Sequence, residues 1–120
     1  MNEGLTFYDS HGTPVAYCDD GEAIYLYSGE PVAYLIDDSV YTYAGKHIGF
    51  VEGGWVRDHS GRCVFFTKDS EGGPVRPMRK VQPVRKAGSV RPVRKVRQVR
   101  PIKAVRQQGW SPLSGRQFLA

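Results

Sequence analysis

The sequence predicts an all-β domain of four pseudo-symmetric antiparallel β-hairpins arranged radially, followed by an extended, polyproline-II-like basic segment. Two observations predict this organisation. The first part of the chain repeats a glycine-centred motif four times, and the second part places an apolar residue at every third position. We therefore divide the chain into an acidic four-hairpin domain (1–73), a basic triplet-repeat segment (74–107) and a C-terminal anchor or tail (108–120).

Charge divides at the same boundary. The 120 residues carry a net charge of +5, but residues 1–73 hold all twelve acids and four basic residues, whereas residues 74–120 hold thirteen basic residues. The two parts therefore carry −8 and +13. No apolar run approaches the ~18 residues that span a bilayer, and residues 1–4 lack the basic start and apolar stretch of a signal peptide. We expect a soluble protein of the cytoplasm.

The acidic part is built on four glycines that lie 17, 16 and 16 residues apart, namely Gly12, Gly29, Gly45 and Gly61. Large residues occupy the third and fifth positions after each glycine, as Val15 and Tyr17, Val32 and Tyr34, Ile48 and Phe50, Val64 and Phe66. The fourth position is small in three copies, as Ala16, Ala33 and Gly49, and Phe65 in the last. Alternating aromatic and β-branched residues around a glycine turn are typical of a β-hairpin. We expect the third and fifth positions to share the inward face.

Four hairpins of this kind have to pack together, because one hairpin alone buries too little surface to be stable in water. The links between the copies, residues 19–22, 37–39 and 52–54, consist of acids, glycines and serine, which favour chain reversal. Closure of the four units into a ring would remove exposed strand edges. A ring of aromatic residues around a central opening would offer room for a small ligand, which we keep as a third functional alternative.

The basic part has a strict period of three. One phase is apolar from Val75 to Val105 through eleven triplets, and the next phase is cationic in nine of eleven positions. The cationic positions are the candidate binding residues: Arg76, Arg79, Arg85, Arg91, Arg94, Arg97, Arg100, Lys103 and Arg106. The remaining phase mixes lysine and polar residues with Pro77, Pro83, Pro92 and Pro101.

A period of three distinguishes between backbone conformations. On an α-helix, residues three apart differ in direction by about 60°, so the apolar phase would drift around the helix. Interior prolines also disfavour a helix strongly. A β-strand has period two, so the valines would alternate between faces. Polyproline II has three residues per turn and aligns each phase into one stripe. The ordered form of residues 74–107 is therefore predicted to be polyproline II or a related extended strand.

Two states of this segment stay open. A basic, proline-rich tail is commonly disordered, but solvation requires no valine at every third position, so we also expect the valine edge to lie against an apolar surface. Extended as polyproline II, the segment would reach roughly 100 Å. It must then fold back, cross a groove or run over neighbouring subunits. Trp110, Leu113 and Phe118 form either a terminal anchor or a frayed end.

No motif for catalysis, a cofactor or a metal is found. The sequences at 9–11 and 58–60 contain Asp, Ser and His, but turn chemistry explains them, because these side chains bond to the backbone in turns. His11, His47 and His59 differ in their offsets from the glycines, so we do not expect symmetry to gather them. Two cysteines at 18 and 63 make no disulfide framework and are expected to be buried free thiols. We expect no enzyme activity and no cofactor.

The cationic stripe points to two kinds of partner. The first is an acidic protein surface, belonging to the same domain, to a neighbouring copy or to another protein, because the −8 and +13 parts attract one another. The chain would then be a non-enzymatic binding or assembly module. The alternative is non-specific nucleic-acid binding through phosphate neutralisation by the arginines. Attraction of the basic segment to a membrane surface is a further interpretation, which the sequence supports less than the other two.

The four glycine repeats, each followed by Val or Ile and then Tyr or Phe, lead into the triplet segment and a Gly109-Trp110-Ser111 ending. Over nearly the whole chain this pattern resembles the four-fold β-flower family of small bacterial proteins. The stretch LTFYDSHGTPVAY is also similar to the YD-type repeats of large secreted shells, but those arrays are far longer and have no triplet tail. The resemblance implies hairpins arranged radially and a function that is not established. It carries over no catalytic residue.

Overall fold

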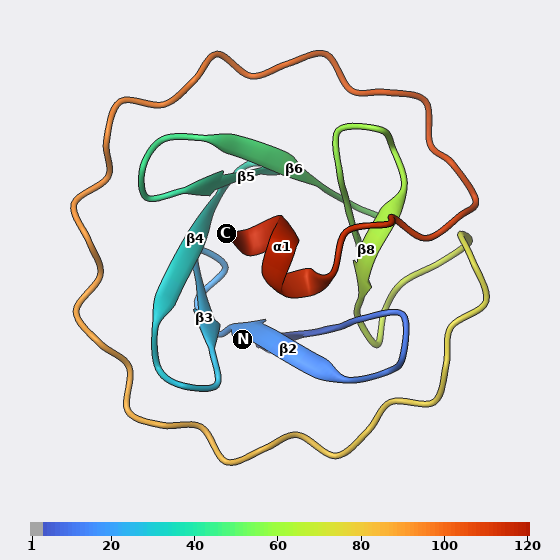
Figure 1. The fold of residues 1–120 in the computed structure, drawn as a ribbon, viewed down its shortest axis with the longest axis horizontal. Helices are drawn as coiled ribbons and strands as arrows, with labels where there is room; N and C mark the ends of the chain where they lie inside the picture. Colours follow the sequence, from blue (N-terminus) through green and yellow to red (C-terminus); the bar gives the residue numbers. More distant parts are fainter. Residues whose placement is uncertain (1–3) are drawn as a thin grey trace.

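The computed structural model describes residues 4–120, and its fold is a closed, all-antiparallel barrel of eight strands (Figure 1). Each strand pairs with the next along the chain, and β8 returns to β1 through the pair Tyr8 and Phe66. The strands are β1 (Leu5–Tyr8), β2 (Pro14–Cys18), β3 (Ala23–Leu26), β4 (Pro31–Ile36), β5 (Ser39–Thr42), β6 (His47–Glu52), β7 (Trp55–Arg57) and β8 (Cys63–Phe66). The strands are three to six residues long.

The four repeats coincide with the four hairpins, β1–β2 to β7–β8, and their glycines occupy the turns. All four glycines have φ between +79° and +91°, a region that residues with a Cβ rarely adopt. Aspartates stabilise two of the turns, because Asp9 Oδ1 accepts from the backbone N–H of His11 and Asp58 Oδ1 from that of Ser60, both at 2.9 Å. The turn interpretation of these two Asp, Ser and His sequences is thus confirmed.

The barrel interior is lined by the fourth position of each repeat. Ala16 and Ala33 are fully buried, and Phe65 is 1% exposed in the same cluster. The third positions belong to this cluster or pack against it. The prediction that the fifth positions also point inward is wrong. Their aromatic rings lie in an outer layer beneath the basic segment, because a bulge at the third position of each repeat, in the even-numbered strands, interrupts the strict alternation of faces.

A short C-terminal helix fills the end of the barrel. Helix α1 (Gly115–Leu119) lies at the centre of the ring of strands (Figure 1). A capping box starts the helix, in which Ser114 accepts from the N–H of Gln117 and the Gln117 side chain accepts from the N–H of Ser114. Phe118 and Leu119 are 3% and 6% exposed within the core cluster. The expected central opening for a ligand is therefore filled by the chain itself.

Of the three candidate anchor residues near the C-terminus, two pack against the barrel. Phe118 packs edge-on against Phe65, with ring centroids 5.9 Å apart. Trp110 is half-buried and packs edge-on against Trp55 at 5.6 Å. Leu113 is 43% exposed and belongs to no core cluster. The chain end is thus fixed by its aromatic residues.

Residues 74–107 contain no helix or strand and run once around the outside of the barrel (Figure 1). The segment passes each hairpin turn in chain order before it reaches the centre and α1. The whole molecule measures 35 × 35 × 29 Å. A length of roughly 100 Å in an extended chain is therefore taken up by encircling the barrel, a route that the sequence did not predict.

Within residues 4–120, no helix has the length and apolar character needed to cross a membrane.

Candidate interaction surface

The basic segment is attached to the hairpin turns by backbone hydrogen bonds at regular intervals. The N–H groups of Lys80, Ser89, Gln98 and Gln107 donate to the carbonyls of Gly12, Gly29, Gly45 and Gly61, at 2.8 to 3.0 Å. Successive donors are nine residues apart, and nine residues are three whole triplets. The same phase of the triplet therefore faces every turn, which explains why the period of three continues without a skipped register.

The turn glycines are also required for the close approach of this segment. A Cβ at Gly45 would lie 2.0 Å from the carbonyl oxygen of Val96, and one at Gly12 would lie 2.0 Å from that of Met78. Gly29 and Gly61 face the carbonyls of Ala87 and Val105 in the same way, at 2.2 Å. Real Cβ atoms do not come so close to an oxygen. The repeated glycine thus serves both the turn and the contact with the segment.

The cationic phase of the segment covers the outer aromatic layer of the barrel. The Arg85 guanidinium lies 3.8 Å from the ring centroid of Tyr17, and that of Arg94 lies 4.0 Å from Tyr34. At such distances the positive charge is attracted to the negative face of the ring. Longer contacts of 5.1 to 5.9 Å join Arg79 to Tyr8, Arg91 to Tyr25, Arg97 to Tyr41, and both Arg100 and Lys103 to Phe50.

Acids of the links between hairpins pair with six of the nine candidate binding residues. Arg85 contacts Asp19 at 2.7 Å, and Arg100 contacts Asp38 at 2.7 Å. The other pairs are Arg91 with Asp20, Arg94 with Glu22, Lys103 with Asp38 and Glu52, and Arg106 with Glu52. Arg76 instead donates to the backbone oxygen of Ser70. The acidic links and the cationic phase thus meet within one chain.

The pKa values of the link acids reflect these contacts. Partial burial alone would raise the pKa of Asp20, but hydrogen bonds from the Ala23 N–H and from Arg91 lower it to about 2. The hydrogen bond from Lys103 lowers the pKa of Asp38 below its ordinary value. Both acids therefore stay ionised, and paired with the segment, at neutral pH.

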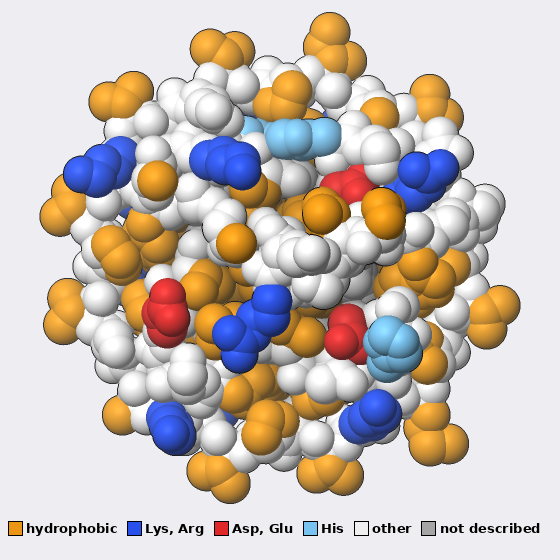
Figure 2. Space-filling view, viewed as in Figure 1, with side chains coloured by type: hydrophobic (Ala, Val, Ile, Leu, Met, Phe, Trp, Pro, Cys, Tyr) orange, Lys and Arg blue, Asp and Glu red, His pale blue; other side chains and the backbone are white. Residues whose placement is uncertain are grey.

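The apolar phase of the segment points away from the barrel, so the prediction that the valine edge lies against an apolar surface is wrong. Ten of its side chains are 81% to 97% exposed. We call them the rim: Val75, Met78, Val81, Val84, Val90, Val93, Val96, Val99, Ile102 and Val105. Hydrophobic side chains project around the outline of the molecule in Figure 2. The aromatic layer favours the arginines over the valines, because it offers negative ring faces next to link acids.

Two of the three histidines come together next to the turns of the third and fourth hairpins, a contact that the sequence did not predict. His47 Nδ1 lies 2.8 Å from His59 Nε2, and the two rings are stacked. His47 Nε2 lies 3.1 Å from Ser39 Oγ, which also accepts from Arg100 Nε. Burial and then the neighbouring His59 and Arg100 lower the pKa of His47 to about 4. A cavity of about 320 Å³ opens beside the pair.

Acidification is expected to destabilise the fold through His47. The residue is 1% exposed and neutral, whereas an unfolded chain takes up the proton near pH 6.5. The free energy of unfolding should therefore fall by about 2–3 kcal/mol between pH 7 and pH 4. Urea unfolding across this range should show a smaller fall in His47→Gln. The exposed His11 provides the control, since His11→Gln should keep the wild-type pH dependence. If the free energy of unfolding of His47→Gln fell with pH as much as that of the wild type, His47 would not be the cause of the loss.

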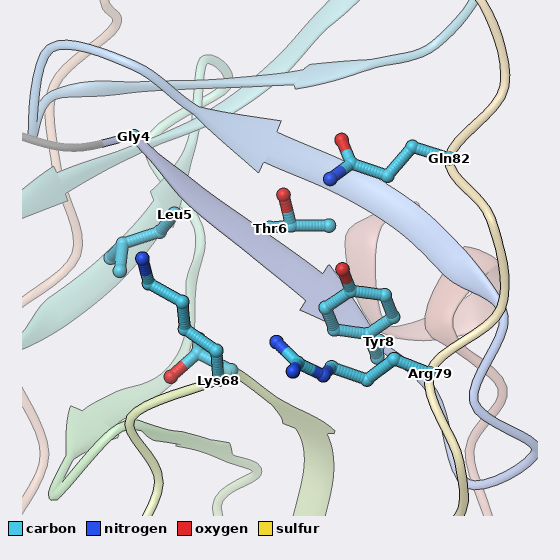
Figure 3. Close-up of a pocket in the computed structure, with 8 residues that line it drawn as sticks. Gly4, Leu5, Thr6, Tyr8, Lys68, Arg79 and Gln82 are labelled. Atoms are coloured by element: carbon cyan, nitrogen blue, oxygen red, sulfur yellow. The ribbon is translucent and has the colours of Figure 1, made fainter.

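A second cavity lies where the barrel closes between β1 and β8. Its volume is about 170 Å³, and Figure 3 shows the side chains of Thr6, Tyr8, Lys68, Arg79 and Gln82 around it. The cavity lies at the seam of the barrel, where the pair Tyr8 and Phe66 joins β1 to β8. No group of three or more His, Cys, Asp or Glu side chains in residues 4–120 is arranged to hold a metal ion.

Comparison with known proteins decides the family. The model of the 4-fold beta flower protein family matches residues 5–119, which is nearly the whole chain. The chain is a 4-fold beta flower protein. No curated protein and no solved structure matches it. The matched range includes the segment that encircles the barrel of this beta flower, residues 74–107.

Several contacts in this beta flower were not predicted from its sequence. Gln98 Oε1 accepts from the backbone N–H of His47 at 2.9 Å. Arg57, a strand residue, donates to the carbonyls of Gly61 and Gln107 at 2.7 and 2.8 Å and so joins the fourth turn to the end of the segment. One signal was present in the sequence: Pro83, Pro92 and Pro101 recur every nine residues, in the triplet phase that also holds the four donors to the turns.

Proposed function

We propose that this protein is a non-enzymatic binding and assembly module whose basic segment docks on the acidic surface of its own barrel. In this proposal the hairpins are arranged radially and residues 74–107 adopt a polyproline-II-like conformation. The observation that carries the proposal is the pairing of the cationic phase with the links, in which four link acids between Asp19 and Asp38 meet four arginines. The binding surface left for other molecules is then the outside of the encircling segment.

The alternative function, non-specific nucleic-acid binding, is less well supported. Phosphate recognition needs cationic side chains that are free to exchange counterions. Arg85, Arg94 and Arg100 each contact both an acid and an aromatic ring of the barrel. Retention on DNA or RNA in low salt, lost steeply by about 0.2 M, would favour the alternative. Absence of retention at all salt concentrations is what internal docking predicts.

Neutralising one group of link acids is expected to loosen the segment next to them. The triple variant Asp19→Asn, Asp20→Asn and Glu22→Gln removes three charges while its amide side chains keep the turn hydrogen bonds. Exchange of the Lys86 and Ser89 amide hydrogens, which donate to the second turn, should accelerate by about tenfold, because three exposed pairs of up to ~1 kcal/mol each are lost.

A matched control for this experiment is available in the barrel. The triple variant Glu30→Gln, Asp37→Asn and Asp69→Asn removes the same charge from acids that make no ion pair within residues 4–120. Amide exchange in this variant should match the wild type. Equal acceleration in both triple variants would show that overall charge, and not docking, controls the segment.

A further inference from the structure

We propose that the cavity where β1 and β8 meet binds a phosphate group. We call it the seam cavity, and its lining includes Thr6, Tyr8, Lys68, Arg79 and Gln82 (Figure 3). The barrel supplies one wall and the basic segment the other, so the inference rests on the docked segment of the proposed function. It goes beyond that function, because it assigns a small anionic ligand to the protein.

The seam cavity and the cavity next to it are lined by three cationic side chains. A neighbouring cavity of about 310 Å³ shares Lys68 and Arg79 with the seam cavity, and Arg76 also lines it. Among residues 4–120, no Asp or Glu lines either cavity. Cations that converge on a cavity without an acid beside them attract an anionic ligand.

The fourth repeat differs from the others in the charge at this place. The seventh residue after the turn glycine is an acid in the first and third repeats, Asp19 and Glu52, and is neutral in the second. Asp19 pairs with Arg85 at 2.7 Å, and Glu52 contacts Arg106 at 3.4 Å. The fourth repeat has Lys68 at this position. A position that neutralises the basic segment in two repeats thus carries a cation at the seam.

Arg79 is the cation best placed to bind an anion. Its guanidinium lies 5.9 Å from the ring centroid of Tyr8, and it makes no ion pair or hydrogen bond in the part of the chain that the structure describes. In Figure 3 the guanidinium points towards Lys68 across the space below the Tyr8 ring. A guanidinium offers five N–H donors in a planar fork that matches two oxygens of a phosphate.

A buried hydroxyl without a partner is a second, independent indication of a ligand. Tyr8 is 5% exposed, and its hydroxyl makes no hydrogen bond within residues 4–120. The tyrosines at the same position of the next two repeats are both bonded, since Tyr25 Oη accepts from Arg91 at 3.0 Å and Tyr41 Oη donates to the Gln98 carbonyl at 3.4 Å. Because a buried hydroxyl without a partner costs free energy, a ligand oxygen in the seam cavity would supply the missing bond.

The directions of the donors favour a tetrahedral anion over a planar one. In Figure 3, Arg79 and Lys68 lie across the space from Gln82. Gln82 Oε1 accepts from Tyr27 Oη at 3.1 Å, so the amide nitrogen of Gln82 is left to donate to a ligand. A carboxylate directs two oxygens in one plane, whereas a phosphate group presents three strong acceptor oxygens around its centre. Donors on opposite sides of one space therefore suit a phosphate.

The two volumes suit a small phosphorylated molecule. The seam cavity of about 170 Å³ is smaller than a typical pocket for a whole organic ligand, so it fits the phosphate group. The neighbouring cavity of about 310 Å³ has Phe66 and Pro77 in its lining and leaves room for an attached organic group. Arg79 lines both cavities and would lie between the two parts of such a ligand.

The test titrates the full chain with inorganic phosphate at constant ionic strength and follows the backbone amide shifts by NMR. Saturable shifts are expected at Thr6 and Arg79 with phosphate, and none with sodium chloride. Arg79→Gln should weaken binding about tenfold or more, because hydrogen bonds between charged groups are the strong ones. Tyr8→Phe removes only the hydroxyl and should weaken binding about threefold or more.

Arg97→Gln is the matched control. Arg97 also makes no ion pair within the described residues 4–120 and lies 5.7 Å from the ring centroid of Tyr41, so the variant removes the same charge and the same kind of ring contact. Arg97 lines neither cavity, and the Tyr41 hydroxyl already has a partner. Phosphate binding in this variant should stay within about twofold of the wild type.

A titration with glycerol phosphate distinguishes two sources of the phosphate group. Tighter binding of this ester than of inorganic phosphate would support a small phosphorylated molecule as the ligand, and exclusion of the ester would support free phosphate.

Three outcomes would overturn the inference. Acetate that binds as tightly as phosphate would show a site for any anion. Equal weakening in Arg79→Gln and Arg97→Gln would show that overall charge, and not the seam cavity, attracts the ligand. An RNA oligonucleotide that binds through Arg79, while neither phosphate compound shifts any amide, would identify nucleic acid as the partner.

Failure of this inference can be separated from failure of the proposed docking. Exchange of the Lys80 amide hydrogen, which donates to the Gly12 carbonyl beside the seam, is measured on the same samples. A protected amide without phosphate binding would overturn the phosphate inference and leave the docked segment in place. An unprotected amide in the wild type would overturn both. If Arg79→Gln itself releases the segment, Tyr8→Phe decides, because it leaves every cation of the segment unchanged.

Discussion

Replacing Phe118 by alanine is expected to lower the free energy of unfolding by about 3–5 kcal/mol. The ring is 3% exposed, packs edge-on against Phe65 and lies so close to β6 that a Cβ at Gly49 would come within 2.8 Å of it. In residues 4–120, α1 is the only element that fills this end of the barrel. Removal of the Phe118 ring would therefore leave a cavity that the strands cannot close. Urea unfolding followed by tryptophan fluorescence measures the change.

Leu113 offers the control for this variant. It lies two residues before the helix start and is 43% exposed, so Leu113→Ala should change the unfolding free energy by less than about 0.5 kcal/mol. If Phe118→Ala were equally mild, the helix would contribute little to the barrel and the filled centre would have no energetic role.

The second large effect is expected at Gly45. Alanine there must adopt φ of +91° and place a Cβ 2.0 Å from the carbonyl oxygen of Val96, so either the turn or the basic segment has to move. Strain at positive φ and overpacking together should reduce the unfolding free energy by about 3 kcal/mol. Amide exchange at Gln98, which donates to the Gly45 carbonyl, should accelerate in the same variant.

Gly21 isolates the two contributions to this effect. It has φ of +73° but no heavy atom within 4 Å of an added Cβ, so Gly21→Ala carries the backbone strain alone and should cost about 1 kcal/mol. Equal destabilisation by Gly21→Ala and Gly45→Ala would mean that contact with the segment does not constrain the turn glycine.

Local patterns in the sequence predicted much of the fold. The spacing of Gly12, Gly29, Gly45 and Gly61 identified four hairpins and their turns, because a turn glycine leaves a signal in adjacent residues. Closure followed from the need to remove strand edges, and the structure has a closed barrel. The aspartates at the turns were likewise understood correctly, since their hydrogen bonds join residues two to four apart.

The faces and partners of the basic segment could not be predicted, because they depend on contacts between distant residues. A stripe of valines normally indicates a buried edge, and that rule fails here because Tyr17 and Tyr34 offer ring faces to Arg85 and Arg94. Those tyrosines were expected inside the barrel. Each bulge that turns them outward inserts one residue, such as Val32 opposite Ile24 and Tyr25, and a single inserted residue leaves no clear mark in the sequence.

The His47 and His59 contact was missed for a related reason. Equal offsets from the glycines would bring residues together only around the symmetry axis, whereas the turn of one hairpin lies beside the first residue of a strand in its neighbour. His59 is in the fourth turn and His47 begins β6 in the third hairpin, so different offsets bring them together. Pseudo-symmetry relates equivalent positions and says little about contacts across the boundary between repeats.

The step of nine residues per hairpin couples the size of the barrel to the length of the chain that surrounds it. A fifth hairpin would widen the perimeter and would demand nine further residues in the segment, added as whole triplets, before the chain could again reach the centre. A single-residue deletion near Gly88 would instead move arginines into the place of valines, and prolines and polar residues into the place of arginines, at every later turn. Duplication of one repeat is therefore not enough to enlarge this architecture, and viable length changes have to occur in both parts at once.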